Sequence, residues 1–282
     1  SVGRALSGGA AGTSGGLVCA WGGASARGAV DGRTPAAPAL AGALGGLEGA
    51  AGVGFDSTTG RVRVAGEGAD SLAVVDVSDP SALTRVGAVA DASRLNGAVG
   101  VAYDAAAQLA FVASAAGDSL TVVDVRDPAA PSVLGTVSDA ARLGGASSVS
   151  FDAASQRAFV ASANSDSLAV VDVSDPARPV LIGSFTDATN LDGAAGVHYD
   201  APTRRAIVVS EHSDSLAVVC VPNELVSITS PLSPPAGPSP PPFPPPQPPA
   251  ECGADFSLTG SQTGNADLQG ARAVAYVAAT QH

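Results

Sequence analysis

Histidines are the first place to look for acid–base or metal chemistry, and this chain has three of them: His198, His212 and His282. His212 is close in sequence to Glu211 and Asp214, so a catalytic triad or a metal site built from these groups is one interpretation. None of the histidines recurs at a regular spacing, and we therefore expect solvated or hydrogen-bonded side chains. We predict no catalytic residue, no metal ligand and no cofactor.

Aspartates, in contrast, recur every 48 residues. Rings of carboxylates can hold calcium. An Asp that precedes Ser, Ala or Asp-Pro also suits a turn, because its side chain accepts hydrogen bonds from nearby backbone amides. We favour the turn interpretation over a calcium site. The recurring sets are Asp76, Asp124 and Asp172; Asp91, Asp139 and Asp187; and Asp70, Asp118, Asp166 and Asp214.

The same interval organises most of the chain. Four copies of a string related to DSLAVVDVSDP follow one another without insertion, and they begin at Asp70, Asp118, Asp166 and Asp214. A second landmark, GVGFD in its first copy, places an aromatic residue at the same interval, at Phe55, Tyr103, Phe151 and Tyr199. Self-similarity of about 40–50 residues is typical of propeller blades.

One repeat unit contains four short apolar runs separated by turn residues. In the second unit they read AVGVAYD, LAFVAS, SLTVVDV and SVLGTVS. Their short length, and the Gly, Asp and Pro residues between them, favour strands over helices. The third run is apolar on both faces, with Leu72 on one and Val75 on the other, so it must be covered twice. A four-stranded blade stacked between two neighbours supplies that cover.

The two ends of the chain resemble partial copies of the unit. Residues 17–42 match the second, third and fourth runs, LTGSQT from Leu258 matches a fourth run, and Ala271 to Tyr276 match a first run. Pairing the last run with the N-terminal strands would complete a blade and remove free sheet edges. The predicted fold class is therefore all-β: a five-bladed β-propeller of four-stranded antiparallel blades, with the ring closed by the C-terminal strand pairing into the N-terminal blade.

The repeat, read as SDSLAVVDVSDP followed by LDGAAGVHYD, resembles the LVIVD-type repeat family of extracellular and surface β-propellers. The likeness covers most of the chain outside a proline-rich segment. It implies a propeller fold and a surface location, and it brings no general set of catalytic residues. The first and last units depart from the pattern, and Val277 replaces the Asp found at Asp56, Asp104, Asp152 and Asp200.

The proline-rich segment interrupts the fifth blade by about 29 residues. Residues 230–250 hold 12 prolines, which lack an amide donor and fix φ, so we expect a polyproline II loop. The register places Cys220 and Cys252 near the two ends of the insertion. We predict a disulfide between them, with free buried thiols as the alternative. Cys19 is expected to be a small core residue.

The same segment is similar to the hydroxyproline-rich stretches of green-algal and plant cell-wall glycoproteins. That resemblance implies prolines that are hydroxylated and O-glycosylated. The alternatives are a flexible spacer or a ligand for proline-binding domains. The candidate modified residues are Pro234, Pro235, Pro240, Pro241, Pro242, Pro244, Pro245, Pro246, Pro248 and Pro249.

Charge narrows the set of partners. The formal net charge is −12, and all 14 basic residues are Arg and are dispersed along the sequence, so we expect neither nucleic acid nor an anionic membrane as a partner. No apolar run approaches the roughly 20 residues that a membrane span needs. We expect other extracellular or surface proteins as partners, with a repeating assembly as one option, and O-linked glycans on the proline-rich segment.

Because the chain opens at Ser1 instead of Met, we expect a mature or excised piece. It divides into a Gly/Ala-rich tail (1–16), a β-propeller (17–229), the proline-rich insertion (230–250) and the propeller completion (251–282). The predicted function is a noncatalytic extracellular structural or interaction module of a cell-wall, matrix or surface-appendage glycoprotein. The alternatives are a propeller hydrolase or lactonase and a carbohydrate-binding lectin.

Overall fold

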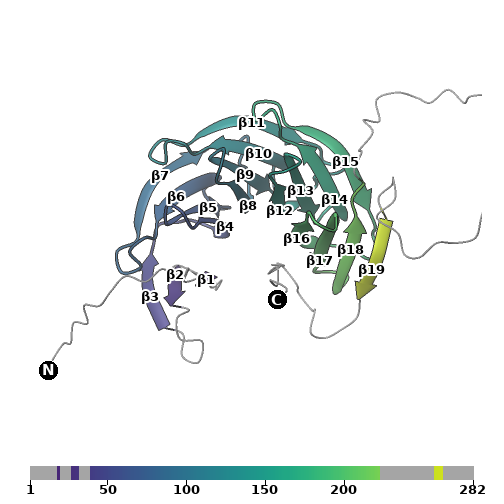
Figure 1. The fold of residues 1–282 in the computed structure, drawn as a ribbon, viewed down its shortest axis with the longest axis horizontal. Helices are drawn as coiled ribbons and strands as arrows, with labels where there is room; N and C mark the ends of the chain where they lie inside the picture. The colour runs from purple at the N-terminus through teal and green to yellow at the C-terminus, as the bar shows by residue number, and fades with distance from the viewer. Residues whose placement is uncertain (1–17, 20–26, 32–38, 223–256, 263–282) are drawn as a thin grey trace, which may run out of the picture.

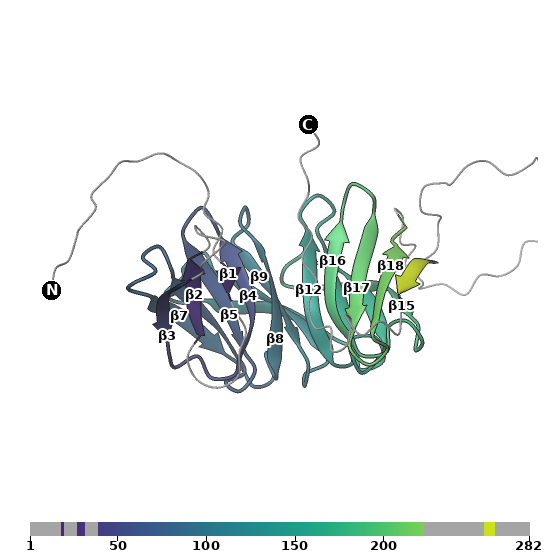
Figure 2. The same cartoon turned by 90° about the horizontal axis from the view of Figure 1, so that it is seen from below.

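The structure is a computed structural model that describes residues 18–19, 27–31, 39–222 and 257–262. These residues form five antiparallel sheets, which we name A to E in chain order. The sheets follow one another around an arc (Figure 1) and stand side by side when the arc is viewed from its open side (Figure 2). No helix in the described part of the chain is long and apolar enough to cross a membrane.

Sheet A has three strands and each of the other sheets has four. Sheet A contains β1 (Val18–Cys19), β2 (Arg27–Asp31) and β3 (Ala39–Leu44). Sheet B contains β4 (Ala50–Asp56), β5 (Arg61–Gly66), β6 (Ser71–Asp76) and β7 (Thr84–Ala90). Sheet C contains β8 (Ala98–Asp104), β9 (Leu109–Ser114), β10 (Ser119–Asp124) and β11 (Ser132–Ser138). Sheet D contains β12 (Ala146–Asp152), β13 (Arg157–Ser162), β14 (Ser167–Asp172) and β15 (Val180–Thr186). Sheet E contains β16 (Ala194–Asp200), β17 (Arg205–Ser210), β18 (Ser215–Cys220) and β19 (Ser257–Gln262).

The third strands of sheets B, C and D carry apolar residues on both faces because each lies between two neighbouring sheets. In β6, Leu72 is fully buried and packs with residues of sheet C, including Val112. On the opposite face of β6, Val75 is 2% exposed and packs near Leu44 of β3. The prediction that this strand is covered on both faces is therefore confirmed, and apolar burial at each junction between sheets holds the arc together.

The strands predicted at the two ends of the repeat are also found. β19 pairs with β18 across the proline-rich insertion, with Leu258 opposite Val219, so the predicted fourth strand of the last sheet is confirmed. Sheet A has the order β1-β2-β3, which matches the predicted second, third and fourth strands of the N-terminal blade. Its predicted first strand, residues 271–276, lies outside the described residues. The described residues therefore form four four-stranded sheets and one three-stranded sheet, and the closed ring of five blades stays a prediction.

The first strands of sheets B to E line the concave side of the arc (Figure 1). Their backbones approach closely: a Cβ placed on Gly100 of β8 would lie 2.9 Å from the carbonyl oxygen of Ser147. A Cβ on Gly52 of β4 would overlap the carbonyl oxygen of Val99. A side chain would not fit at these two positions, so the neighbouring first strands approach backbone to backbone there.

Candidate functional sites

The first two sets of recurring aspartates form turns, as predicted. In one set, a carboxylate oxygen accepts a hydrogen bond from the backbone N–H two residues on: Asp76 from Ser78, Asp124 from Arg126 and Asp172 from Ser174, each at 2.9 Å. Asp91, Asp139 and Asp187 do the same with Ser93, Ala141 and Thr189 at 2.9–3.0 Å. Hydrogen bonds, chiefly those donated by the hydroxyls of Ser78 and Ser93, hold the pKa of Asp76 and of Asp91 below its ordinary value.

The third set lies in turns as predicted, but the predicted bonds from these carboxylates to nearby amides are not found among the described residues. Asp70, Asp118 and Asp166 sit in hairpins with φ of 46–48°, a left-handed conformation that Asp tolerates better than most residues. Each carboxylate accepts a hydrogen bond from a glycine N–H 27 residues later, in the connection to the next sheet. The pairs are Asp70–Gly97 at 2.8 Å, Asp118–Gly145 at 2.8 Å and Asp166–Gly193 at 3.1 Å. These carboxylates therefore tie neighbouring sheets together.

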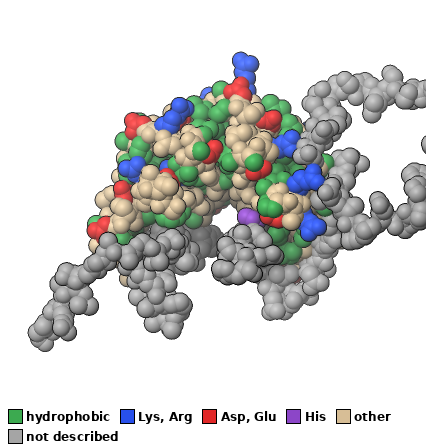
Figure 3. All heavy atoms as spheres, in the orientation of Figure 1, with side chains coloured by type: hydrophobic (Ala, Val, Ile, Leu, Met, Phe, Trp, Pro, Cys, Tyr) green, Lys and Arg blue, Asp and Glu red, His purple; other side chains and the backbone are tan. Residues whose placement is uncertain are grey.

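The described histidines and acidic groups do not gather into a metal site, and His282 lies outside the described residues. The Nδ1 atom of His212 lies 3.2 Å from Oδ1 of Asp192, and the His212 side chain is 66% exposed. His198 is half-buried on β16. Among the described residues, no group of three or more His, Cys, Asp and Glu side chains is placed to hold a metal ion. Figure 3 shows acidic and basic side chains intermixed over the outer surface of the arc.

The predicted disulfide and modification sites fall largely on residues that the structure does not describe. Cys220 ends β18, is 4% exposed and is disulfide-bonded. Cys252 lies outside the described residues, so the Cys220–Cys252 pairing remains a prediction. All the candidate hydroxyprolines lie within residues 223–256, which are also outside the described part of the chain.

One contact between sheets recurs but changes its chemistry along the arc. A side chain of the second strand stacks on an aromatic ring of the next sheet's first strand. The ring centroids are 4.4 Å apart for Phe111 and Phe151, and 3.8 Å apart for Phe159 and Tyr199. Between sheets B and C, Arg63 takes the position of Phe111, and its guanidinium carbon lies 3.6 Å from the ring centroid of Tyr103.

Arg63 is the centre of a buried polar cluster that the sequence analysis did not identify. Its side chain is 2% exposed, and its Nη1 atom lies 3.4 Å from Oδ2 of Asp56. The hydroxyl of Tyr103 donates a hydrogen bond to the same Asp56 oxygen at 3.2 Å. Thr58 and Thr59 donate further hydrogen bonds to this carboxylate. The Asp56 carboxylate is therefore well supplied with donors, as a buried ion pair requires, whereas the Nε atom of Arg63 is buried and has no hydrogen-bond partner among the described residues.

The cluster perturbs two pKa values in opposite directions. Burial raises the pKa of Asp56, but the hydrogen bonds from Thr58 and Thr59 and the charge of Arg63 outweigh burial, so the pKa lies far below its usual range. Burial raises the pKa of Tyr103, and the neighbouring Asp56 charge acts in the same direction. At neutral pH the cluster therefore contains a carboxylate, a guanidinium and a neutral phenol.

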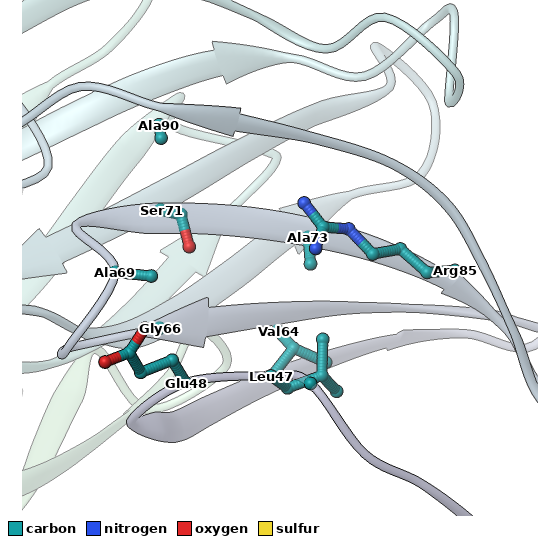
Figure 4. A pocket seen from close by; sticks show the side chains of 10 residues that line it. Leu47, Glu48, Val64, Gly66, Ala69, Ser71, Ala73, Arg85 and Ala90 are labelled. Atoms are coloured by element: carbon teal, nitrogen blue, oxygen red, sulfur yellow. The ribbon is translucent and has the colours of Figure 1, made fainter.

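A cavity of about 190 Å³ lies against the face of sheet B that is turned toward sheet A. Its walls include the apolar side chains of Leu47 and Val64 and three polar groups, those of Glu48, Ser71 and Arg85. In Figure 4 the Arg85 side chain reaches across toward Ala73, and the Glu48 carboxylate lies on the Gly66 side. Among the described residues, none offers these three side chains a hydrogen bond or an ion pair.

The LVIVD repeat is found three times in the chain, at residues 65–91, 108–139 and 157–187. Each match spans the third and fourth strands of sheet B, C or D, together with all or part of the second strand. No curated protein matches the sequence.

Solved structures match the fold at low sequence identity. The periplasmic gluconolactonase of Pseudomonas aeruginosa is 13% identical, with a TM-score of 0.63 over 88% of this chain and 68% of that one. A Lactobacillus plantarum protein is 15% identical, with a TM-score of 0.62 over 86% of this chain. The chain spans 64% of the length of that protein, which is less than two thirds. The β-propeller domain of Cps50 (Swd1) from Myceliophteria thermophila is 13% identical, with a TM-score of 0.51 over 84% of this chain and 67% of that one. The fold is therefore propeller-like.

Proposed function

We propose that this chain is a noncatalytic extracellular structural and interaction module, in which the propeller is a scaffold and the proline-rich loop is the glycosylated or partner-contacting element. One observation carries the proposal: the recurring aspartates accept hydrogen bonds from backbone amides within or between the sheets. Side chains used in this way stabilise the fold, and carboxylates that are saturated by N–H donors are poor bases.

The proposal includes a closed ring of five blades. Sheet A lacks a first strand among the described residues, and Phe55 of β4, on the face turned toward sheet A, is 44% exposed. Residues 271–276 would complete sheet A and cover this region, since a free edge strand and an exposed apolar ring both favour unwanted association. Removal of residues 263–282 should lower the unfolding midpoint. An unchanged midpoint would rule out the closing strand.

The proline-rich loop gives the proposal its extracellular part. Two features of the sequence support it, the 12 prolines of residues 230–250 and the buried, disulfide-bonded Cys220 at the end of the strand that leads into the insertion. Structural disulfides are typical of oxidising compartments outside the cytosol. The proposed partners are other wall, matrix or surface proteins, and the proposed modifications are O-linked glycans.

Mass spectrometry of the native protein tests this function. We expect peptides from residues 230–250 to carry hydroxyproline and attached sugar at several of Pro234, Pro240 and Pro244. Matched peptides from Pro80, Pro128 and Pro176, which lie in turns of the propeller, should carry unmodified proline. Unmodified proline throughout both groups would overturn the glycoprotein assignment.

Lactone hydrolysis is the second candidate, because a gluconolactonase is among the proteins that share this fold. At 13% identity the likeness concerns the fold, and this activity needs its own test. Purified protein should be assayed for opening of gluconolactone, with the metal ions used by propeller hydrolases added one at a time. Saturable turnover above the spontaneous rate would favour the enzyme over the scaffold.

A further inference from the structure

Counted between register-equivalent positions, the connection from sheet A to sheet B is three residues shorter than its counterparts. The pairing of β2 with β3 shifts register after Ala29, and the pairing of β6 with β7 shifts after Val74. When these two shifts are aligned, Leu44 of β3 corresponds to Val89 of β7. Leu95 comes six positions after Val89, whereas Leu47 comes only three positions after Leu44. Leu47 and Leu95 are equivalent, because the carbonyl of each accepts a hydrogen bond from the N–H three residues on, at 3.1 and 3.0 Å.

The missing residues form a turn at every other described junction, and that turn has a hydrogen-bonding role. Its last carbonyl accepts a hydrogen bond from a hydroxyl on the third strand of the following sheet. The pairs are Thr121 with Arg94 at 2.5 Å, Ser167 with Arg142 at 2.8 Å and Ser215 with Asn190 at 2.5 Å. Ser71 is the equivalent of Ser119, Ser167 and Ser215. Ser119 has no hydrogen-bond partner among the described residues, since Thr121 donates to the carbonyl at its junction, and the shortened connection brings Ser71 no such carbonyl.

The cavity of about 190 Å³ occupies this place. The leucines that end the longer connections, Leu95, Leu143 and Leu191, are fully buried, whereas Leu47 is only half-buried. Arg85 stands at the position of Val133 and Leu181, so a guanidinium replaces an apolar side chain where the cavity opens. Compared with the other junctions, the shorter connection and Arg85 leave a polar pocket where apolar side chains stand elsewhere.

We infer that this pocket binds a small carboxylate that carries a hydrogen-bond donor on its α-carbon, the chemistry of an α-amino acid or an α-hydroxy acid. Arg85 presents a planar fork of N–H donors that matches a carboxylate. The hydroxyl of Ser71 can donate to the same carboxylate, which would take the place of the backbone carbonyl found at the other junctions. Glu48 can accept from the α-ammonium or α-hydroxyl group.

The apolar side chains select for size. Leu47 and Val64 line the pocket, and burial of a methyl group or short alkyl chain against them adds affinity. Opposite charges on Arg85 and Glu48 disfavour a simple anion or a simple cation, because each would meet one like charge. The inference does not depend on the scaffold function, since the pocket lies on sheet B and uses no residue of the proline-rich loop.

NMR titration of the full chain tests the site, with L-alanine, L-lactate and propionate as probes. We expect saturable shifts of the amides of Gly46, Gly66 and Ser71 with L-alanine or L-lactate, with Kd on the order of 1 mM for ligands of this size. Propionate, which lacks the α-donor, should bind more weakly than both. Failure of L-alanine and of L-lactate to shift these amides would overturn the inference.

Two variants separate binding in the pocket from general surface effects. Arg85→Leu, which installs the residue found at Leu181, should weaken binding at least about tenfold, the scale expected for loss of a charged hydrogen bond. Arg178→Leu, at an exposed turn of sheet D, should bind like the wild type. In the Glu48→Gln variant, the Kd of L-alanine should approach that of propionate. Equal binding by the Arg85→Leu variant and the wild type would contradict the assignment.

A connection graft provides a test that preserves the fold. Replacement of Gly45-Gly46 by Ala-Asp-Ala-Ser-Arg, the five residues that precede Leu95, should refill the pocket and abolish binding while the protein remains folded. Retention of the wild-type affinity in the graft would show that the probes bind elsewhere.

Discussion

The junction between sheets D and E and the junction between sheets A and B are built from corresponding positions. They differ in how many of those positions make contacts between the sheets. At the first, Phe159 stacks on Tyr199, and Asp166 bonds to the amide of Gly193. At the second, Cys19 takes the register position of Phe159, and Phe55 remains 44% exposed. The side chains of the regular junction stabilise the fold, whereas the irregular junction leaves polar groups available to a ligand.

The junction between sheets B and C lies between these extremes, because Arg63 replaces the stacking Phe but remains buried. Arg63→Ala should destabilise the protein by about 3–5 kcal/mol, since it leaves the Asp56 carboxylate buried without its ion-pair partner. Arg63→Phe removes the same ion-pair partner but restores the ring found at Phe111, so it should lose less than Arg63→Ala by roughly 0.5–1.5 kcal/mol, the contribution of ring stacking. Urea unfolding measures both, and an unchanged stability in Arg63→Ala would show that the cluster is not coupled to folding.

Truncation of a leucine should cost less stability at the A–B junction than at the D–E junction. Leu168 of β14 is fully buried, so Leu168→Ala should cost about 2–5 kcal/mol through lost burial and a new cavity. Leu47→Ala should cost less than half of that loss, because Leu47 is half-buried beside an existing pocket. Equal losses in chemical denaturation would mean that the A–B junction is as well packed as the others.

A smaller effect should appear at acidic pH. The native pKa of Asp56 lies far below the value near 3.9 expected in the unfolded chain. The ionised carboxylate therefore contributes stability above about pH 4 that is lost as the pH falls toward the native pKa. Wild-type stability should decline below about pH 4, and Asp56→Asn should show a shallower decline. Parallel pH profiles of the two proteins would contradict the proposed role of Asp56.

The smallest contrast concerns two equivalent serines. Ser167 donates a hydrogen bond to the carbonyl of Arg142, so Ser167→Ala should cost about 1 kcal/mol and leave a buried acceptor without its partner. Ser71→Ala should change stability by less than about 0.5 kcal/mol, because no described residue accepts a hydrogen bond from Ser71. Thermal unfolding of both variants under one condition makes the comparison. A larger loss at Ser71 would place that hydroxyl in the fold instead of in the pocket.

The strands were predictable because each carries its own apolar pattern. The repeat located β8, β9 and β11 at their observed bounds, and it located β19 beyond the insertion, since LTGSQT retains the fourth-strand pattern. The turn roles of Asp76 and Asp91 were also predictable, because an Asx turn depends on neighbouring residues.

What escaped prediction depends on contacts between sheets. The bond from Gly97 to Asp70 joins residues 27 positions apart and follows from how two sheets pack. Alignment of the repeats places Arg63 at the position of Phe111 and Phe159 and so marks a charged residue in an aromatic position. The alignment does not identify its partners, because Asp56 and Tyr103 come from two different sheets. The pocket depends on a deletion of three residues in a Gly-rich connection, where no side-chain pattern marks the register.

Amide hydrogen exchange tests the contrast between regular and irregular junctions most directly. Gly97, Gly145 and Gly193 donate their N–H groups to aspartates across junctions, whereas no described residue accepts a hydrogen bond from the equivalent N–H of Gly49. We predict strong protection at the first three amides and fast exchange at Gly49. Equal protection at all four glycines would contradict the claim that the A–B junction is the open one.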